Sequence, residues 1–239
     1  MDLINEHPFF DGTQPFVLGF ITLDYSEISN MNRKIWDISP PIHSQSPVFP
    51  GDAPYQQTWT WQLSDTCPVN VSTLRLSPHV GAHADAPLHY KAGAASAGMM
   101  DLHPFLGPCR VLHVIGCTGL IQPHHIEHAL LYAPPRILVR TYKDQVPHVW
   151  EDSFAAFAPE TIDLLHAHGI RLIGIDTPSI DPASSKSLDS HKRILSYDMR
   201  VLENLDLCAV DAGDYELIAL PLKLMEADAS PVRAVLRAL

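Results

Sequence analysis

The sequence predicts one mixed α/β domain, and three features support that class. The chain has 239 residues, of which 46% are hydrophobic, enough to bury one sizeable core. Two segments are typical of helices, 123–131 and 159–168, and the second begins at Pro159 and ends before Gly169. Near-continuous apolar runs, typical of strands covered on both faces, occur at 110–115, 136–141 and 171–175.

Weaker strand signals flank these elements. Residues 69–76 alternate between apolar and polar side chains and lead directly into a histidine-rich segment. Prolines between Pro40 and Pro54 stiffen a long early loop, whose tip is the turn-like segment 49–52. Shorter strand-like runs occur at 35–38, 216–222 and 232–236.

Residues 1–32 differ from the rest of the chain. They carry acidic and aromatic side chains without clear periodicity. We expect residues 1–32 to be an N-terminal extension, disordered or not native, and residues 33–239 to form the domain. Met31 is then a candidate for the physiological start, and N-terminal sequencing of the native protein would decide this.

Composition excludes several functions. The formal charge is −11, from 16 basic and 27 acidic residues, and no basic stripe is present, so nucleic acid is not an expected partner. No apolar stretch approaches the ~18 residues of a membrane span, and the N-terminus lacks a basic signal-peptide region. Four widely spaced cysteines without a C-x-x-C pair indicate reduced structural thiols and a cytoplasmic protein. They are Cys67, Cys109, Cys117 and Cys208.

The most informative segment lies between Pro78 and Tyr90. Its even positions are small or apolar, whereas its odd positions carry most of the polar groups. In an extended chain, successive side chains point to opposite faces, so one face would gather imidazoles and a carboxylate. These are the ligands that zinc prefers, and a metal-held water becomes a nucleophile near neutral pH. The polar residues are His79, His83, Asp85 and His89.

Geometry adds a condition to this interpretation. In a straight strand the Cα atoms of His79 and His83 would lie roughly 13 Å apart, too far to share one ion comfortably. We therefore expect a bend at Gly81, which tolerates unusual φ and leaves room for a metal. The alternative is a half-buried strand whose histidines merely meet solvent; three histidines and an aspartate on one face favour the metal site.

Two further residues are candidate ligands, His191 and Glu203. In one straight helix they would be roughly 18 Å apart, so they can share an ion only if the chain turns back between them. Taken singly, each of these residues is typical of a protein surface.

With its flanking segments, the histidine run resembles the H-x-G-x-H-x-D-x-P-x-H signature of the metal-dependent cyclase-like hydrolases, and among them the bacterial kynurenine formamidases (arylformamidases). The resemblance covers residue 35 to the end of the chain. It implies an α/β fold of the swivelling β/β/α type with a mixed sheet, usually assembled as a homodimer. Further matching segments are 36–40 (WDISP), 49–52 (FPGD), 76–79 (LSPH), 174–179 (GIDTPS), 213–217 (GDYEL) and 229–234 (ASPVRA).

The resemblance also implies two divalent metal ions per subunit, with zinc expected. His79, His83 and Asp85 would hold the first ion. Asp85 would bridge to a second ion, completed by His191 and Glu203. The same nitrogen and oxygen ligands also accept manganese and other divalent ions.

Other residue roles follow from the same resemblance. His89 would be the proton donor and acceptor. Phe49 would face the substrate ring at a position where we expect tryptophan in the formamidases, so the shape of the ring pocket differs. Asp176 and Tyr215 lie in matched segments and are interpreted as structural supports.

The implied reaction is hydrolysis of N-formyl-L-kynurenine to L-kynurenine and formate in tryptophan degradation. A metal-activated hydroxide would attack the formyl carbon, and His89 would pass a proton to the leaving aryl nitrogen. An alternative is a hydrolase of the same family acting on another amide, ester or cyclic substrate. Assays on N-formylkynurenine, simple esters and lactones would separate these two.

Two other classes are weaker alternatives. A cupin-type oxygenase would also use a His-x-Gly-x-His run, but no second cupin-like motif follows, and such an enzyme would depend on iron and dioxygen. A non-catalytic metal-binding protein would bind metal without hydrolysing any formamide.

Overall fold

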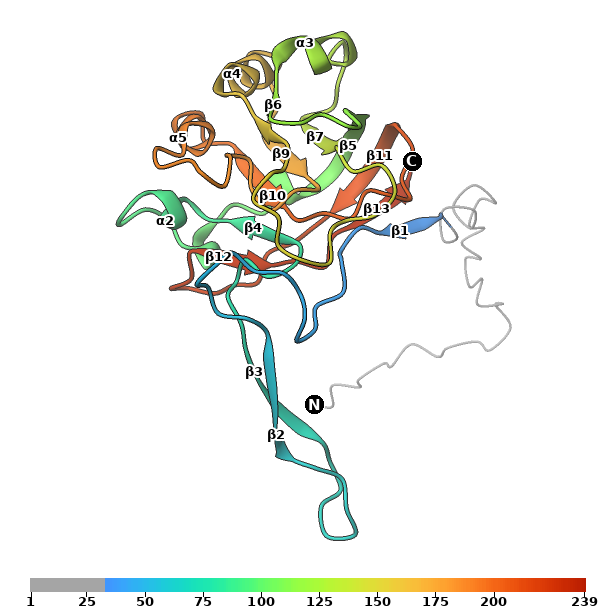
Figure 1. Cartoon of the computed structure of the whole chain (residues 1–239). Coiled ribbons are helices and arrows are strands. Elements are labelled where there is room, and N and C mark those ends of the chain that lie inside the picture. Colours follow the sequence, from blue (N-terminus) through green and yellow to red (C-terminus); the bar gives the residue numbers. More distant parts are fainter. Residues whose placement is uncertain (1–32) are drawn as a thin grey trace, which may run out of the picture. The chain divides into compact units, whose positions relative to one another are not determined.

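A nine-stranded mixed sheet organises the protein, whose computed structural model describes residues 33–239 (Figure 1). The expectations for residues 1–32, including the start at Met31, lie outside the described residues. In sheet order the strands are β1 (Ile35–Asp37), β13 (Val235–Ala238), β11 (Gly213–Ile218), β5 (Leu106–His113), β7 (Arg136–Arg140), β9 (Leu172–Ile175), β10 (Arg200–Glu203), β4 (His83–Asp85) and β12 (Ala229–Pro231).

The central strands β5, β7, β9 and β10 run parallel. β7 and β9 are covered on both faces, as the apolar runs 136–141 and 171–175 predict, whereas β5, which contains most of the run 110–115, is exposed at both ends. Successive residues of β7 enter two separate core clusters. Leu138 packs in one cluster, whereas Ile137 and Val139 pack in the other, and all three are fully buried. The alternation of side chains along one strand therefore builds both layers of the core.

The helices supply the cover on one face of the sheet. Ile162 of α4, Ile194 of α5 and Ile126 of α3 all join the cluster that contains Ile137. The other cluster is closed by the sheet itself, because Ile38 beside β1 and Ala84 of β4 belong to it together. The helical segments are α2 (Pro87–Tyr90), η2 (Ala97–Met99), η3 (His103–Phe105), α3 (Pro123–Ile126), η4 (Glu127–Ala129), α4 (Pro159–Ala167) and α5 (Asp189–Ser196).

Predicted and observed elements agree closely in the core and less well near the ends. The helix predicted over 159–168 is α4, whereas the one predicted over 123–131 divides into α3 and the 3₁₀ turn η4. The strand predicted over 216–222 is β11, which starts earlier and ends before Pro221, a residue that cannot donate a ladder hydrogen bond. The run 232–236 falls between β12 and the beginning of β13.

The alternating run 69–76 forms a strand, but not a half-buried one. It is β3 (Val71–Arg75), which pairs with β2 (Gln56–Trp61) in an antiparallel hairpin that extends away from the main sheet (Figure 1). Every residue of both strands is exposed. The alternation therefore predicts the strand correctly, but it carries no information about what covers it. The remaining strands, β6 (Leu120–Ile121) and β8 (Ala156–Phe157), form a separate parallel pair.

Two further findings concern the described chain as a whole. Within residues 33–239, no helix has both the length and the apolar character needed to cross a bilayer. All four cysteines are free thiols, as their spacing predicts.

Candidate metal centre and active site

The chain bends at Gly81, as the histidine spacing requires. This glycine has a φ of +69°, and a Cβ there would lie 2.8 Å from Cγ1 of Ile42. A side chain would therefore be strained at this position and would also clash. Past the bend, the imidazole centroids of His79 and His83 are 4.9 Å apart.

The extended segment after the bend is shorter than the alternation predicts. The strand β4 ends at Asp85, and Pro87 begins the short helix α2, which carries His89. The expectation of one extended run through His89 is therefore wrong, because a proline at the first helical position favours a turn of helix there. The small residues that alternate with the polar ones are buried, as expected: Val80, Ala82, Ala84 and Ala86.

His191 and Glu203 reach the cluster because the chain turns back between them. His191 lies on α5, which ends at Ser196, and a turn containing Asp198 at φ +50° leads into β10, which ends at Glu203. Glu203 is paired with His83 on the neighbouring strand β4. Both side chains are almost fully buried, so their assignment as surface residues when taken singly does not hold.

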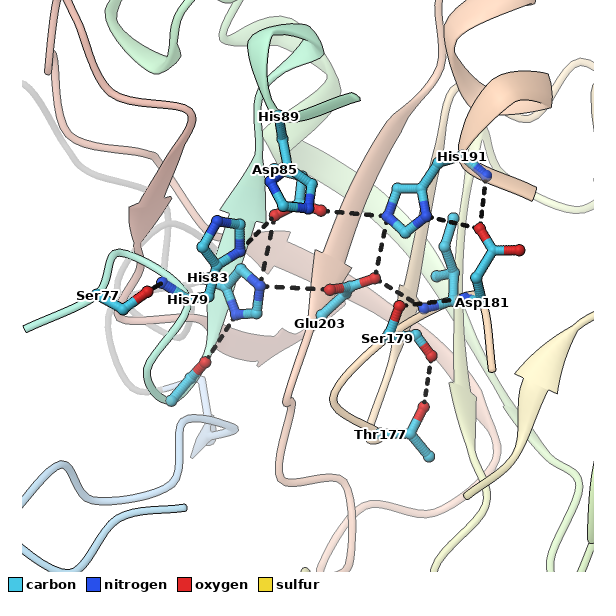
Figure 2. A network of polar contacts seen from close by, with 12 residues as sticks. Ser77, His79, His83, Asp85, His89, Thr177, Ser179, Asp181, His191 and Glu203 are labelled. Carbon is cyan, nitrogen blue, oxygen red and sulfur yellow. Dashed lines mark hydrogen bonds and ion pairs between the residues drawn. The ribbon is translucent and has the colours of Figure 1, made fainter. Parts of the chain in front are cut away.

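Asp85 lies at the centre of the assembled side chains (Figure 2). Its Oδ1 is 3.1 Å from Nδ1 of His79 and 3.4 Å from Nε2 of His83. Its Oδ2 is 3.2 Å from Nε2 of His191. One fully buried carboxylate thus presents each of its oxygens to a different group of imidazoles.

Glu203 closes the cluster from the opposite side. Its Oε2 is 3.3 Å from Nε2 of His83, and its Oε1 is 3.5 Å from Nε2 of His191. The backbone N–H of Ile180 donates to Oε1 over 2.7 Å and fixes the carboxylate. Two buried carboxylates, Asp85 and Glu203, therefore share the imidazoles of His83 and His191, and Asp85 alone contacts His79.

Each of the three imidazoles turns one nitrogen inward, and its other nitrogen meets an outer partner. Such partners fix ring orientation and tautomer in metal sites and raise the basicity of the ligand. Sequence reasoning did not identify the two outer aspartates, since a single aspartate carries no local signal. The outer contacts are His79 Nε2 to Asp228 Oδ2 at 3.0 Å, His83 Nδ1 to the carbonyl of Gly81 at 2.9 Å, and His191 Nδ1 to Asp181 Oδ2 at 2.7 Å.

Two buried atoms of the cluster are left without a hydrogen bond within the described chain. They are Nε2 of His83 and Oδ1 of Asp85, both in the interior of the site. A buried polar atom without a partner destabilises the fold, and a cation would satisfy both atoms at once. The donor set of imidazole nitrogens and carboxylate oxygens therefore fits a divalent metal.

The charges of the site support the same interpretation. Burial by itself would lower the pKa of His79, but the neighbouring carboxylates of Asp85 and Asp228 raise it to about 9. Burial opposes ionisation of Asp85 too, yet contacts with His191 and His79 hold the pKa of its carboxyl well below the usual range. A site that keeps protons on imidazoles above neutral pH is one in which a cation can replace them.

His89 lies beside this cluster rather than within it. Its ring centroid is 4.4 Å from that of His79, and its Nδ1 is 3.3 Å from Oδ2 of Asp228. Asp228 thus contacts both histidines with one oxygen. In the described chain, three triads lie close enough to hold an ion: His79–His83–Asp85, Asp85–His191–Glu203 and the more open His79–His89–Asp228.

A cavity of about 310 Å³ opens over the cluster, with His79, His89 and Glu203 in its wall. Phe49 also lines it and is 55% exposed. An aromatic group forms the adjoining part of the wall: Trp150 packs edge-on against Phe49 with centroids 5.2 Å apart, and against Phe154 with centroids 6.1 Å apart.

Asp176 and Tyr215 lie outside the described metal triads. The carboxylate of Asp176 accepts hydrogen bonds from both the backbone and the hydroxyl of Thr141, each 2.7 Å long, and from the backbone of Tyr142 at 2.9 Å. Tyr215 donates its hydroxyl to the carbonyl of Asp211 over 3.0 Å. Both residues hold neighbouring segments in place.

Comparisons with known proteins define the class of this fold and site. The family model Cyclase, described as "Putative cyclase", matches residues 36–182. A solved structure described as "Potential Metal-Dependent Hydrolase With Cyclase Activity" aligns with a TM-score of 0.76 at 27% identity, covering 87% of this chain and 98% of that one. Isatin hydrolase A from Ralstonia solanacearum, with a TM-score of 0.73 at 17% identity, supports the fold alone. The class is thus the cyclase family of hydrolases.

Within this family, the chain belongs to the kynurenine formamidases. It is 65% identical to the kynurenine formamidase of Bordetella avium over 207 residues, which cover 87% of this chain and 99% of that protein. The kynurenine formamidase of Delftia acidovorans is 62% identical over 209 residues and is covered completely. The family and fold expected from the sequence motifs are therefore confirmed, and the chain is a hydrolase.

Proposed function

We propose that this enzyme hydrolyses N-formyl-L-kynurenine to L-kynurenine and formate, as the name of its relatives implies. The observation that carries the proposal is the cluster around Asp85, where three imidazoles and a second carboxylate converge below an aromatic-lined cavity. This arrangement joins a candidate metal site to a surface suited to an aryl ring.

The ligands divide naturally into two groups around Asp85. We propose that His79, His83 and Asp85 hold one divalent ion, and that Asp85, His191 and Glu203 hold a second. The division is supported by the two oxygens of Asp85, since Oδ1 faces the first pair of histidines and Oδ2 faces His191. Zinc is the expected metal for this set of nitrogen and oxygen ligands.

Bound divalent ions would activate water near neutral pH and polarise the formyl carbonyl. The protein supplies the remaining requirements. Nδ1 of His89 is held by Asp228, which leaves Nε2 of His89 for proton exchange at the cavity wall. We propose that Nε2 delivers a proton to the aryl nitrogen as the C–N bond breaks, so that the amine leaves neutral.

The aromatic wall is proposed to bind the substrate ring. Phe49 presents an exposed face to the cavity, and Trp150 holds that ring edge-on from behind. Aromatic side chains of this kind bury a ligand ring without needing a polar partner. The ring would then lie beside the cluster, with its formamide group directed toward His89.

We further propose that two copies of the chain form a homodimer in the cytoplasm. The β2–β3 hairpin exposes Trp59, Trp61 and Leu74, although an isolated two-stranded hairpin is at best marginally stable in water. A second copy would cover these side chains. Four free cysteines fit a reducing compartment.

The experiment that tests the function combines elemental analysis with a formate-release assay on the purified protein. We expect two equivalents of zinc or another divalent ion per chain, and formate release from N-formyl-L-kynurenine that a chelator abolishes and metal restores. Preferential hydrolysis of simple esters or lactones would favour a different cyclase-family reaction. Bound metal with no hydrolysis of any formamide would contradict the proposal.

A further inference from the structure

The cavity over the cluster is uneven in charge. Among the described residues that line it, Lys186 is the one lysine or arginine, whereas Asp52 and Glu203 contribute acidic groups. The chain as a whole carries a formal charge of −11. Such a protein repels an anionic ligand unless a local cation offsets the field, and the proposed metal ions would do so only at the cluster itself. Lys186 is the cationic side chain that the cavity wall offers to an anionic group elsewhere on the ligand.

Lys186 is carried by a loop with defined internal contacts. The backbone N–H of Ser185 donates to the carbonyl of Pro182 over 2.8 Å, and the N–H of Leu188 donates to the hydroxyl of Ser185 over 3.0 Å. The loop begins at Asp181, whose carboxylate accepts from the first turn of α5. The lysine is thus attached to the same framework as the candidate metal ligands.

The ammonium group of Lys186 forms no ion pair with the described chain. By contrast, Lys192 on α5 lies 3.7 Å from the carboxylate of Asp189. A lysine that lines a cavity and is not engaged by the protein's own carboxylates is available to an anionic group of a ligand.

The proposed substrate has an anion at the required end. A formylkynurenine molecule carries its formamide on the ring and, ortho to it, a keto side chain that ends in an amino acid carboxylate. With the formamide at the cluster and the ring on Phe49, the side chain would extend along the wall of the cavity that Lys186 also lines. We propose that Lys186 binds this carboxylate and makes the enzyme selective for aryl formamides with an anionic tail; this inference rests on the proposed function.

Two substrates isolate the tail. N-formyl-L-kynurenine has it, whereas 2′-formamidoacetophenone keeps the ring, ketone and formamide and lacks the amino acid. In Lys186→Gln, we expect the KM for formylkynurenine to rise about tenfold or more, which corresponds to one lost charge-assisted hydrogen bond. The kcat for formylkynurenine should change by less than about threefold, since Lys186 would not contact the reacting formamide. The KM for 2′-formamidoacetophenone should also change by less than about threefold, since that substrate has no carboxylate for Lys186 to bind.

Two further variants sharpen the test. Lys186→Arg keeps the charge and should recover most of the KM for formylkynurenine. Lys192→Gln removes a nearby surface charge of the same type and should leave both KM values at the wild-type level. An equal loss on both substrates, or no loss on formylkynurenine, would overturn the inference.

A binding measurement separates this inference from the proposed function. Calorimetric titration with L-kynurenine and with 2′-aminoacetophenone compares a ligand that has the amino acid tail with one that lacks it, and neither ligand is turned over. If neither formamide is hydrolysed, the proposed function fails. A Kd for L-kynurenine that weakens about tenfold in Lys186→Gln, with no change for 2′-aminoacetophenone, would still support the carboxylate contact. Equal affinities of wild type and variant for kynurenine would overturn it.

Discussion

Asp181 and His191 are joined side chain to side chain, with Oδ2 of the aspartate 2.7 Å from Nδ1 of the histidine. The same carboxylate accepts the backbone N–H groups of Ser190 and His191, so it fixes both the start of α5 and the ring that α5 carries. The inward nitrogen of His191 is thereby directed at Asp85 and Glu203.

Asp181→Asn tests whether this contact tunes a metal ligand. The amide can accept at only one of the two positions, that facing the N–H of Ser190 or that facing the N–H and Nδ1 of His191. It also carries no negative charge to polarise the imidazole, so metal affinity should fall about 10–100-fold. Chelator competition measures this directly. Asp189→Asn, on the exposed side of the same helix, is the control and should leave affinity unchanged. Equal affinities for Asp181→Asn and wild type would show that the contact serves only the helix.

Variants of His89 and His83 test whether proton transfer and metal binding are carried out by different histidines. His89→Ala should keep its metal and lose about 10²–10⁴-fold in kcat, because a positioned proton donor contributes on that scale. His83→Ala removes an inward nitrogen and should lose metal as well as activity. Elemental analysis and formate release on the same samples distinguish the two effects. Full activity in His89→Ala would exclude it from proton transfer.

Phe49→Ala tests the proposed ring contact. Loss of the aromatic face should raise KM for formylkynurenine about tenfold with little change in kcat, since the ring is bound equally before and during reaction. Phe49→Trp should retain or lower the wild-type KM. Tyr132→Ala, 91% exposed and not among the residues lining the cavity, is the matched control. A loss confined to kcat would contradict a simple ring contact.

The proposed dimer contact through the β2–β3 hairpin is tested by measuring the molecular mass of the protein in solution. Cross-strand register places Trp59 opposite Ser72 and Gln57 opposite Leu74, so Trp59 and Leu74 share one face. The double variant Trp59→Ser with Leu74→Ser should shift light-scattering mass from two chains to one. Tyr132→Ser is the exposed control and should stay dimeric. A monomeric wild type would remove the homodimer from the proposal.

The sequence predicts one part of the candidate site from local features alone and the other part only through resemblance to a family. The histidine run carries its own evidence, because alternation, a flexible glycine and three imidazoles occur within eleven residues. His191 and Glu203 carry none, since their convergence depends on a turn at Asp198 and on strand pairing with β4. The outer aspartate Asp228 is likewise brought to the site only by tertiary folding.

Similar reasons explain which features of the fold could be predicted from the sequence. The runs in β7 and β9 predict buried strands because both faces are apolar, and both are buried. The hairpin strand β3 follows the same period as a half-buried strand, yet all its residues are exposed. Periodicity reports local geometry, whereas the surface that covers a strand is supplied by distant segments or by another chain.

Asp176 gives a prediction about stability and pH. Burial raises the pKa of its carboxyl from 3.8 to about 6, despite hydrogen bonds from Tyr142 and Thr141. Because the folded-state pKa lies above the unfolded one, ionisation destabilises the fold. The destabilisation is absent below pH 4, grows between pH 4 and 6, and is complete above that range, at a magnitude on the order of 3 kcal/mol.

Asp176→Asn cannot ionise and therefore escapes this penalty. Its amide can still accept the backbone N–H groups and donate to the hydroxyl of Thr141, which reverses its role in that contact. Relative to wild type, the variant should gain on the order of 3 kcal/mol in free energy of unfolding between pH 4 and 7, as measured by urea denaturation at each pH. Asp214→Asn is the control: hydrogen bonds from Arg110 lower the pKa of Asp214, so the stability of wild type relative to this variant rises only as pH approaches 4 from below and should stay constant between pH 4 and 7. A difference between Asp176→Asn and wild type that does not vary with pH would show that Asp176 ionises as readily in the folded chain as in the unfolded one.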